Sequence, residues 1–436
     1  MTGEKLRILL LGSGGREHAQ AWKIAQSPLL GELAVMPGSD GIALLPRTRC
    51  IAGNPADKEA VLKYAAAFKP DLILIGPEGP LAAGVSDALR DAGYKVAAPS
   101  QAAAKLESSK IFAKSFMMGH GIPTADFAIA VSPEDAEVKI SQWDVEGRGI
   151  VVKADGLAAG KGVVVTHDIG EALETAHAFM SDPTCSVKSD MLLLEEKLTG
   201  REVSAFALCD GTDFVMMGYA CDYKRVNDGN EGPNTGGMGG YAPQDWPSES
   251  ARAFIEKYIF RNVLEGMAAA GTPYTGFLFA GLMIDGADIK VIEFNTRFGD
   301  PEAQILLPMI DDDIVPLLLA AAEGRLFAMN PPRMKSGSAV HVVMTSEGYP
   351  ETFGTGMRLG ETIALPDDLL AGGANDNALL FIAGAAKKDG AWQNTGGRVL
   401  GVTATADTLA EARDKAYEAI RRIHFNGAHW RSDIGH

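Results

Sequence analysis

The segment from Val291 to Gln304 (VIEFNTRFGDPEAQ) combines residue types that suit phosphate and metal chemistry. If it begins as a strand, the period of two places Glu293, Asn295 and Arg297 on one face. A carboxylate and an amide oxygen two residues apart are hard ligands that suit Mg²⁺ holding phosphate oxygens. Arg297 would then clamp a transferring phosphoryl group with planar, permanently charged donors.

The same pattern has a simpler interpretation, which is the exposed face of an amphipathic strand. Ile292, Phe294 and Phe298 would then face away from the three polar residues. The turn that follows, residues 299–302 (GDPE), adds two further carboxylates. We regard the whole segment as the strongest candidate site in the sequence.

Lys153 is the only charged residue of an apolar segment, 149–154 (GIVVKA), that reads as a strand. Burying an ammonium group without a partner is costly, and a nucleotide phosphate is one natural partner. The alternative is a lysine on an edge strand that points to water. Lys110 lies on a helical segment one turn before Lys114, and by itself it reads as a solvated helix residue.

A glycine-rich loop, residues 155–161 (DGLAAGK), joins this strand to a second one at residues 162–166 (GVVVT), which predicts a hairpin. The loop departs from the phosphate-binding pattern G-x4-G-K-[ST], and it joins two strands instead of a strand and a helix. Gly160 and Lys161 suit a lid that closes over ATP phosphates and excludes water from a reactive intermediate. A plain flexible turn is the alternative.

Near the N-terminus, the apolar run LRILLLG leads into a glycine-rich turn that contains Gly12, Gly14, Gly15 and Arg16. The dinucleotide pattern G-x-G-x-x-G is broken, because a glutamate replaces its third glycine, and a dehydrogenase is therefore disfavoured. A strand-to-helix turn still presents backbone N–H groups that suit the phosphate of a small molecule. A tight turn without a ligand is the alternative.

Two polar, glycine-dense stretches contain too few apolar residues to form core: 222–225 (DYKR) and 232–240 (GPNTGGMGG). We interpret them as a loop that wraps a small substrate, and a disordered linker is the alternative. The candidate residues within them are Asp222, Lys224, Asn234 and Gly237.

The candidate sites need several domains to position them, since 436 residues exceed the size of one hydrophobic core. Strands at residues 6–12 and 72–75, each followed by a helix, predict a parallel sheet over the first hundred residues. A mixed α+β block follows, and the last block ends in a strand at 398–403 and a helix at 409–423 that Thr408 caps. We therefore expect four domains, at residues 1–123, 124–196, 197–332 and 333–436.

The bulk composition excludes several classes of protein. With 56 acidic and 40 basic residues, a net charge of -16 and a pI near 5.0, most of the surface repels nucleic acid and anionic lipid. The four cysteines show no zinc-site spacing and read as reduced thiols. Neither a signal peptide nor a membrane span is predicted. We expect a cytoplasmic monomer without nucleic-acid or membrane partners.

The chain resembles the phosphoribosylamine-glycine ligases, also called glycinamide ribonucleotide synthetases, of the ATP-grasp superfamily. The resemblance runs nearly end to end, and it rests on GSGGREHA at Gly12, GPEGPL at Gly76, LESSKIFAKSF at Leu106, VVKADGLAAGKGV at Val151, GPNTGGMGGY at Gly232, RFGDPEAQ at Arg297 and GGRVL at Gly396. It implies an α/β fold with a Rossmann-like N-terminal parallel-sheet domain (preATP-grasp), an ATP-grasp unit and a C-terminal α+β domain.

The resemblance also implies a reaction, in which ATP and Mg²⁺ (or Mn²⁺) support the joining of glycine to 5-phosphoribosylamine through glycyl phosphate, in purine biosynthesis. It implies catalytic roles for Arg297, Lys153 and Asp222, and metal ligation by Glu293 and Asn295. ATP would contact Lys110, Lys153, Gly160, Lys161, Glu195, Glu196, Leu198 and Glu202. The other substrates would contact Gly12, Gly14, Gly15, Arg16, Glu78, Lys224, Asn234, Gly237 and Asp300.

Some positions depart from the family pattern. Gly281 stands where many ATP-grasp enzymes carry an additional acidic metal ligand, so phosphates, waters or Asp285 would complete the metal shell. Tyr223 replaces an expected histidine, and the chain ends at His436, slightly early, so that a few further residues are expected. Another ATP-grasp carboxylate-amine ligase, a biotin-carboxylase-like enzyme and a regulatory nucleotide-binding protein are alternatives.

Overall fold

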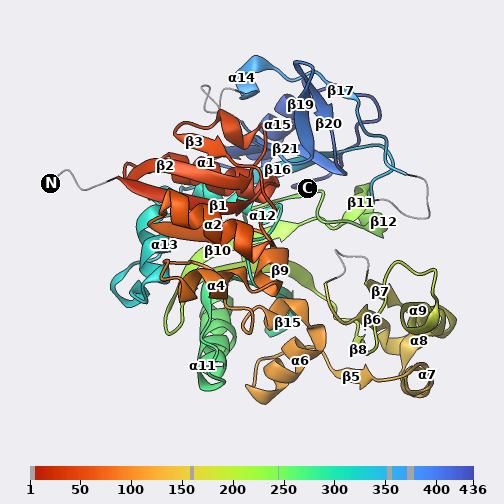
Figure 1. Cartoon of the computed structure of the whole chain (residues 1–436). Helices are drawn as coiled ribbons and strands as arrows, with labels where there is room; N and C mark the ends of the chain where they lie inside the picture. Colours follow the sequence, from red (N-terminus) through yellow and green to blue (C-terminus); the bar gives the residue numbers. More distant parts are fainter. Residues whose placement is uncertain (1–4, 158–161, 244, 351–355, 371–377) are drawn as a thin grey trace.

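The computed structural model describes residues 5–157, 162–243, 245–350, 356–370 and 378–436 (Figure 1). Gly160 and Lys161, which we expected in a lid, lie outside these residues. Within the described ranges, no helix combines the length and the apolar character that crossing a membrane requires.

The N-terminal domain is a parallel sheet in the order β3-β2-β1-β4, which confirms the prediction from alternating strands and helices. Its strands are β1 (Leu6–Gly12), β2 (Leu30–Pro37), β3 (Thr48–Cys50) and β4 (Leu72–Ile75). Its helices are α1 (Gly15–Ala25), α2 (Lys58–Phe68), α3 (Glu78–Ala82) and α4 (Val85–Asp91). Ile8 and Leu10 enter one apolar cluster and Leu9 and Leu11 another, because both faces of β1 are covered.

Two short helices lead out of this domain: α5 (Lys105–Ser108) and α6 (Lys110–Gly119). Helix α6 begins where the Ser109 hydroxyl accepts a hydrogen bond from the backbone N–H of Phe112. It contacts strands of both halves of the region that follows, β8 in the small subdomain and β15 in the large sheet. Side chains on its first turns can therefore reach the space between the two sheets.

The small subdomain is an antiparallel sheet in the order β5-β8-β6-β7. Its strands are β5 (Phe127–Ala130), β6 (Ile150–Ala154), β7 (Val163–Thr166) and β8 (Leu192–Glu196). Its helices are α7 (Pro133–Ser141), α8 (Val145–Arg148) and α9 (Ile169–Ser181). The predicted hairpin is confirmed, since β6 and β7 pair from Ile150 with Thr166 to Lys153 with Val163.

An eight-stranded sheet in the order β15-β14-β9-β10-β13-β16-β21-β18 runs through the rest of the chain. Its strands are β9 (Arg201–Asp210), β10 (Phe214–Asp222), β13 (Gly239–Tyr241), β14 (Thr275–Asp285), β15 (Asp288–Asn295), β16 (Ser338–Thr345), β18 (Leu379–Ile382) and β21 (Arg398–Ala406). Because β13 pairs with β16, the sheet is continuous across the boundary that we expected near residue 332.

Helices cover both faces of this sheet: α10 (Glu249–Phe254), α11 (Arg261–Ala269), α12 (Glu302–Leu306), α13 (Val315–Ala322) and α15 (Leu409–Ile420). As predicted, Thr408 caps α15, and its hydroxyl accepts from the N–H of Glu411. The C-terminal part also holds β17 (Thr362–Ile363), α14 (Asp367–Leu370), β19 (Ala385–Lys388) and β20 (Ala391–Asn394). A two-stranded hairpin, β11 (Arg225–Asn227) with β12 (Glu231–Asn234), projects between β10 and β13.

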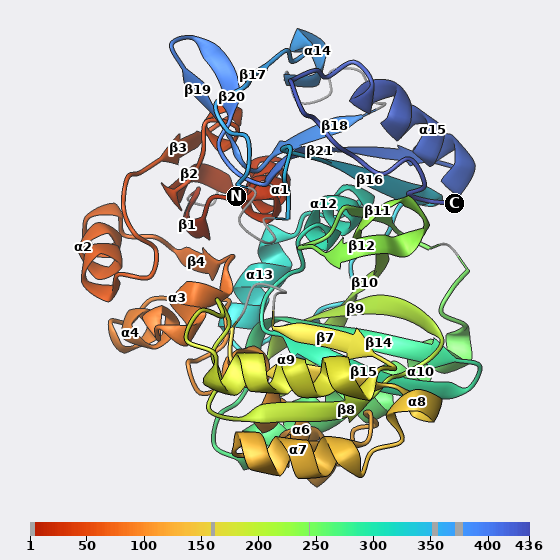
Figure 2. The same ribbon diagram turned by 90° about the vertical axis from the view of Figure 1, so that its right-hand side faces the viewer.

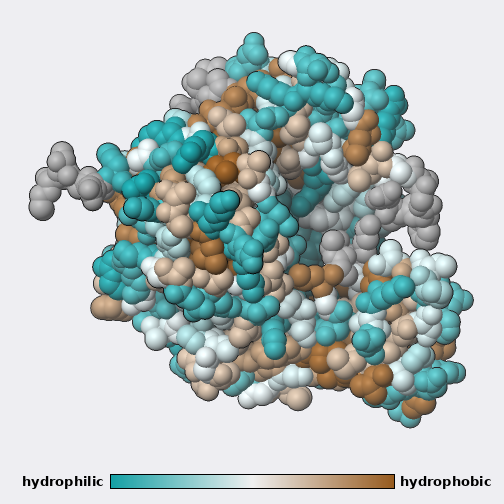
Figure 3. All heavy atoms as spheres, viewed as in Figure 1, coloured by the Kyte–Doolittle hydropathy of each residue, from teal (hydrophilic) through white to brown (hydrophobic). Residues whose placement is uncertain are grey.

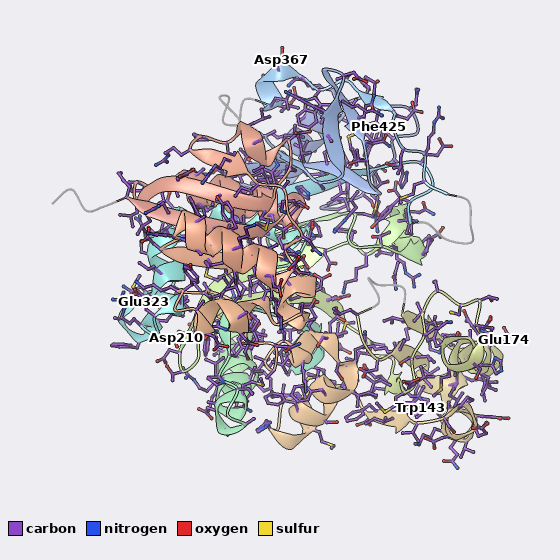
Figure 4. All side chains as sticks on the ribbon, viewed as in Figure 1. Trp143, Glu174, Asp210, Glu323, Asp367 and Phe425 are labelled. Atoms are coloured by element: carbon purple, nitrogen blue, oxygen red, sulfur yellow. The ribbon has the colours of Figure 1, made fainter. Side chains whose placement is uncertain are left out.

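The views show how these parts are arranged. In Figures 1 and 2 the N-terminal domain lies beside the C-terminal domain, which contributes β16, β18 and β21 to the large sheet, and the small subdomain lies apart from both. Trp143 and Glu174 mark the small subdomain in Figure 4, and Asp367 and Phe425 mark the C-terminal domain. Figure 3 shows a hollow between these two parts with hydrophilic residues on its floor.

Candidate active site

Strand β15 carries the predicted metal ligands. Gly281 of β14 pairs with Glu293 and Leu282 pairs with Val291, so that Ile292 is an extra residue in β15. Beyond this bulge, Glu293 and Asn295 share one face, and the Asn295 amide nitrogen lies 3.5 Å from Glu293 Oε1. A rotated amide would present its oxygen beside the carboxylate, so the pair has the donor set that a divalent cation needs.

The prediction that Arg297 continues this strand face is wrong, because β15 ends at Asn295. Glu107 redirects the chain here, since its Oε2 accepts from the backbone N–H of Thr296 at 2.8 Å and from the Thr296 hydroxyl at 3.0 Å. Phe298 consequently packs on Phe206 in a different apolar cluster from Phe294, so these two rings do not face the same way.

Arg297 is nevertheless held next to the strand. Its Nη2 lies 2.8 Å from Glu107 Oε1, and its Nε lies 3.5 Å from Glu78 Oε2. Only 16% of its side chain is exposed. The guanidinium is thus fixed by two carboxylates from the N-terminal domain and α5.

Three lysines meet between the small subdomain and α6. Lys153 is buried, and its Nζ lies 3.0 Å from Glu195 Oε2, which also binds Lys114 Nζ at 3.2 Å. The other oxygen of Glu195 is buried and accepts no hydrogen bond from the described residues. Lys110 donates to the carbonyl of Gly156 at 2.7 Å.

Burial lowers the pKa of Lys114 to about 8. Burial, together with the nearby Lys153, also lowers the pKa of Lys110, although Glu293 opposes the shift. The expectation of a solvated helix residue is therefore wrong for Lys110. A group of cations partly stripped of water favours an anionic ligand.

Glu196 follows Glu195 on β8, but its side chain points to other partners. It pairs with Arg148 at 2.6 Å and with Lys290 at 2.9 Å. These partners lower the pKa of Glu196 to about 2 against the effect of burial. The Glu196 side chain is thus engaged, whereas the backbone of this segment, as far as the half-buried Leu198, and the unbonded oxygen of Glu195 are left for a ligand.

A group of carboxylates and one lysine gathers near Glu293, from strand β9, from the end of β10 and the residues after it, and from helix α12. Lys224 Nζ donates to Glu202, and Glu302 Oε1 lies 3.1 Å from the Ser204 hydroxyl. Ser204 pairs with Gly281, the neighbour of Glu293.

Asp222 lies among these charges at the end of β10. Burial, together with the nearby Glu302 and Glu202, raises the pKa of Asp222 to about 7, although Lys224 opposes this shift. Burial also raises the pKa of Glu302. A carboxylate that titrates near neutral pH can accept a proton during a reaction.

The glycine-rich turn at the N-terminus is occupied by its own glutamate. Glu17 Oε2 accepts from the backbone N–H groups of Ser13 at 3.2 Å and Gly14 at 2.7 Å, while its Oε1 lies 2.6 Å from Arg16 Nε. The residue that breaks the dinucleotide pattern therefore takes the place of a phosphate at these two donors. Gly12, with φ 129°, has no room for a side chain against Glu17.

The turn at Asp300 meets the polar loop and the C-terminal domain. Arg398 Nη1 donates to the carbonyls of Gly236 at 2.5 Å and Asp300 at 2.7 Å, and its Nη2 lies 3.3 Å from Asp300 Oδ2. Although burial opposes it, Arg398 and Arg16 lower the pKa of Asp300. A side chain at Gly237 would strike Pro301, so this loop must be glycine to pack on the turn. Asn234 lies half-buried at the end of β12.

Glu78 connects the two halves of the site. Its Oε2 lies 3.9 Å from Arg16 Nη1 and 3.5 Å from Arg297 Nε. Burial opposes ionisation, but Arg297 and Arg16 outweigh it and lower the pKa of Glu78. The charged carboxylate thus joins the glycine-rich turn to the residues beside the predicted metal ligands.

Some predicted partners lie elsewhere. Asp285 is exposed at the far end of β14 and contacts Thr199 at 3.5 Å, so it does not complete a metal shell with Glu293. The sequence did not assign five charged residues to the site: Glu17, Glu107, Lys114, Glu302 and Arg398. All but Glu17 have their partners at long sequence separations. Glu302 and Arg398 lie in the RFGDPEAQ and GGRVL segments, and this position within family motifs was the feature of the sequence that could have identified them as site residues.

The arrangement defines the class of protein as an ATP-grasp enzyme. Lysines lie between the sheet of the small subdomain and the large sheet, and they face the Glu293 carboxylate and the Asn295 amide. Three family descriptions match the chain: "Phosphoribosylglycinamide synthetase, N domain" over residues 6–107, its "ATP-grasp (A) domain" over 108–303 and its "C domain" over 339–436. The chain belongs to the phosphoribosylglycinamide synthetase family, also called phosphoribosylamine-glycine ligase, and is an ATP-dependent carbon-nitrogen ligase of the ATP-grasp type.

Individual relatives agree with this assignment. The chain is 43% identical over 433 residues to the phosphoribosylamine-glycine ligase of Caulobacter vibrioides, covering 99% of this chain and 98% of the relative. The crystal structure of the Thermotoga maritima phosphoribosylamine-glycine ligase superimposes with a TM-score of 0.84 at 35% identity, covering 98% of this chain and all of that one. A Campylobacter jejuni biotin carboxylase (TM-score 0.71, 16% identity, 98% and 93% covered) shares the fold alone.

Proposed function

We propose that the chain joins glycine to 5-phosphoribosylamine, forming glycinamide ribonucleotide while ATP becomes ADP and phosphate. The observation that carries the proposal is Glu78, which links Arg16 at the glycine-rich turn to Arg297 at the phosphoryl site. A ligase of this kind must hold its amine substrate beside the acid that it activates, and this contact brings the two regions together.

In the proposed reaction, an oxygen of the glycine carboxylate attacks the γ-phosphorus of ATP, and ADP leaves. Lys110, Lys153 and Arg297 neutralise the charge on the phosphates and align them. The amine of phosphoribosylamine then attacks the carbonyl carbon of glycyl phosphate, and inorganic phosphate departs with the bonding electrons. No serine or cysteine nucleophile takes part in these steps.

The second step releases a proton from the attacking nitrogen. We assign its acceptance to Asp222, whose raised pKa suits a base at neutral pH. Glu302, buried and bound to the Ser204 hydroxyl, lies with it on the same side of the sheet and favours a single negative charge shared between the two carboxylates.

ATP would lie between the small subdomain and the large sheet, with its base on the backbone of residues 195–198 and its ribose on Glu202. The buried, unbonded oxygen of Glu195 supports this placement, because it awaits a donor such as an exocyclic amine. Glu293 and Asn295 would hold Mg²⁺ or Mn²⁺, which when bound neutralises phosphate charge. The roles of Gly160 and Lys161 over the phosphates remain predictions.

The remaining substrates would lie between the N-terminal turn and the polar loop. Gly12, Gly14, Gly15 and Arg16 would hold the phosphoribosyl group, although Glu17 already satisfies two of the backbone donors. Arg16 is then the main cation for the phosphate. Lys224, Asn234, Gly237 and Asp300 would line the path between the two substrates.

An assay that couples ADP release to an optical signal tests the proposal, with glycinamide ribonucleotide identified by mass spectrometry. ADP and product should form only when ATP, glycine and freshly generated phosphoribosylamine are all present. Alanine in place of glycine, and bicarbonate in place of both substrates, serve as controls. ADP release with bicarbonate alone, or equal release with alanine, would contradict the proposed substrates.

A further inference from the structure

The hairpin β11–β12 joins two parts of the proposed site, because Lys224 precedes it and Asn234 ends it. The strands pair only from Arg225 with Asn234 to Asn227 with Glu231, and most of the hairpin is exposed. A two-stranded hairpin of this size is marginally stable by itself. Contacts with another part of the chain must therefore stabilise the hairpin.

The last residues of the chain supply that support, and we name residues 429–435 the C-terminal clasp. Both Figure 1 and Figure 2 place the C-terminus near β11 and β12. His429 Nε2 lies 2.9 Å from the carbonyl oxygen of Val226, and the backbone N–H of Ser432 donates to Asp228 Oδ1 at 2.8 Å. The backbone N–H of Gly229 donates to Asp433 Oδ2 at 2.9 Å.

Arg431 is the centre of the clasp. Its side chain is 0% exposed, and it pairs with both oxygens of Asp433, at 2.7 Å from Nε and 2.6 Å from Nη2. Its Nη1 donates to the carbonyl of Arg225 at 3.1 Å and to Asn230 Oδ1 at 2.9 Å. The guanidinium thus bonds both the beginning and the tip of the hairpin.

The clasp also reaches the residue between two proposed site residues. Tyr223 separates Asp222 from Lys224, and its ring centroid lies 4.7 Å from the Arg431 guanidinium carbon. The backbone N–H of Gly435 donates to the Tyr223 hydroxyl at 3.2 Å. Because side chains alternate along an extended chain, fixing Tyr223 on the clasp directs its two neighbours to the opposite side, where Lys224 meets Glu202.

A buried ion pair is weak evidence for stability, since desolvation of both charges offsets most of their attraction. The directed hydrogen bonds of such a pair do fix the orientation of the groups that it binds. Outside the clasp, the side chains of Arg431 and Asp433 bond groups of the hairpin, which leads from one substrate region to the other, while the Arg431 carbonyl accepts from the Tyr417 hydroxyl of α15. The geometry therefore fits orientation of the hairpin better than stabilisation of the fold.

We propose that Arg431 and Asp433 are positioning residues that hold the β11–β12 hairpin so that Lys224 and Asn234 face the substrates. The inference rests on the proposed function for the identity of those substrates. It assigns the C-terminal clasp a part in activity, although none of its residues needs to touch a substrate.

The test compares Arg431→Ala and Asp433→Asn with Arg422→Ala, which breaks an exposed arginine–aspartate pair in the same domain (2.6 Å from Asp368). Hydrogen–deuterium exchange should accelerate about tenfold or more at residues 225–234 in the two clasp variants only. The kcat/KM for glycine and phosphoribosylamine should fall by about tenfold to a hundredfold, while ATP affinity changes less than about threefold.

Unchanged hairpin exchange in a folded clasp variant, or faster exchange with normal kcat/KM, would overturn the inference. A loss that falls equally on ATP affinity would overturn it as well. If Arg431→Ala does not fold, Asp433→Asn decides, because it keeps the side-chain volume. If the wild-type protein forms no glycinamide ribonucleotide, the proposed function fails, and the exchange measurement still decides whether the clasp holds the hairpin.

Discussion

Replacing Asp222 by Asn should stabilise the protein at alkaline pH while it lowers turnover. The carboxyl group is half-buried beside Glu302 and Glu202, and burial with these charges raises its pKa from 3.8 to about 7. Lys224 is the facing cation, and it offsets this effect only in part. The folded protein therefore binds a proton at Asp222 that the unfolded chain has already released.

The sign of the effect follows from this difference. Between about pH 4 and pH 7 the folded state holds more protons than the unfolded state, so stability falls as the pH rises. For one such group, the free energy of unfolding falls by about 1.4 kcal/mol for each pH unit, and by at most about 4 kcal/mol over the full window. The amide in the Asp222→Asn variant carries no charge at any pH, so the variant should lack this loss.

Urea unfolding at pH 5, 6, 7 and 8, without nucleotide or divalent metal, measures the difference. As the pH rises, the urea midpoint of Asp222→Asn should move above that of the wild type. The free energy of unfolding of the variant should gain about 3 kcal/mol relative to the wild type between pH 5 and pH 8. Asp414→Asn, at a side chain that is 72% exposed, is the control and should show no such trend. A difference that stays constant with pH would refute the buried charge, and normal turnover would refute the proton-accepting role.

Four further substitutions, at three positions, probe other parts of the site. Arg297→Lys should lower turnover about a hundredfold with ATP binding retained. Arg297→Ala should also lower the melting temperature, because Glu107 loses its partner at 2.8 Å. Equal turnover of the wild type and the Lys variant at matched enzyme concentration would contradict this. Glu293→Gln should raise the Mg²⁺ concentration for half-maximal activity about tenfold or more, as measured by metal titration. Gly12→Ala should destabilise the protein by about 1–3 kcal/mol, as calorimetry can check, since φ is 129° and the new Cβ would lie 2.4 Å from Glu17 Cγ.

The parts of the fold that the sequence predicts are those with local periodicity. The apolar run in β1 indicates a strand buried on both faces, and the pair of strands around residues 155–161 indicates a hairpin, because each signal lies within a few residues. The continuous sheet from β15 to β18 could not be predicted in the same way. Its central contact, β13 with β16, joins segments about a hundred residues apart, and β13 is a three-residue glycine-rich strand.

The prediction of the site was limited in the same way, to residues that are close together in the sequence. Alternation along β15 correctly grouped Glu293 with Asn295, but it could not anticipate the bulge at Ile292 or the turn that Glu107 imposes at Thr296. The burial of Lys114 was equally hidden, because its partner, Glu195, lies on a strand of another subdomain. Such pairing depends on tertiary contacts between distant segments, which a single sequence does not reveal.

The charges in this site have a further consequence for how ATP binds. Four of the cations expected near a substrate already have a carboxylate partner: Lys153 with Glu195, Arg297 with Glu107, Arg16 with Glu17 and Lys224 with Glu202. Lys114 shares Glu195 with Lys153, and Lys110 bonds the Gly156 carbonyl, so the site offers directed donors with a small net positive charge. A nucleoside triphosphate brings more negative charge than these pairs can offset. Lys110, Lys153 and Arg297 therefore offset only part of this charge, and we expect a divalent cation to offset the rest. The carboxylate of Glu293 beside the uncharged amide of Asn295 suits a cation that arrives already bound to phosphate.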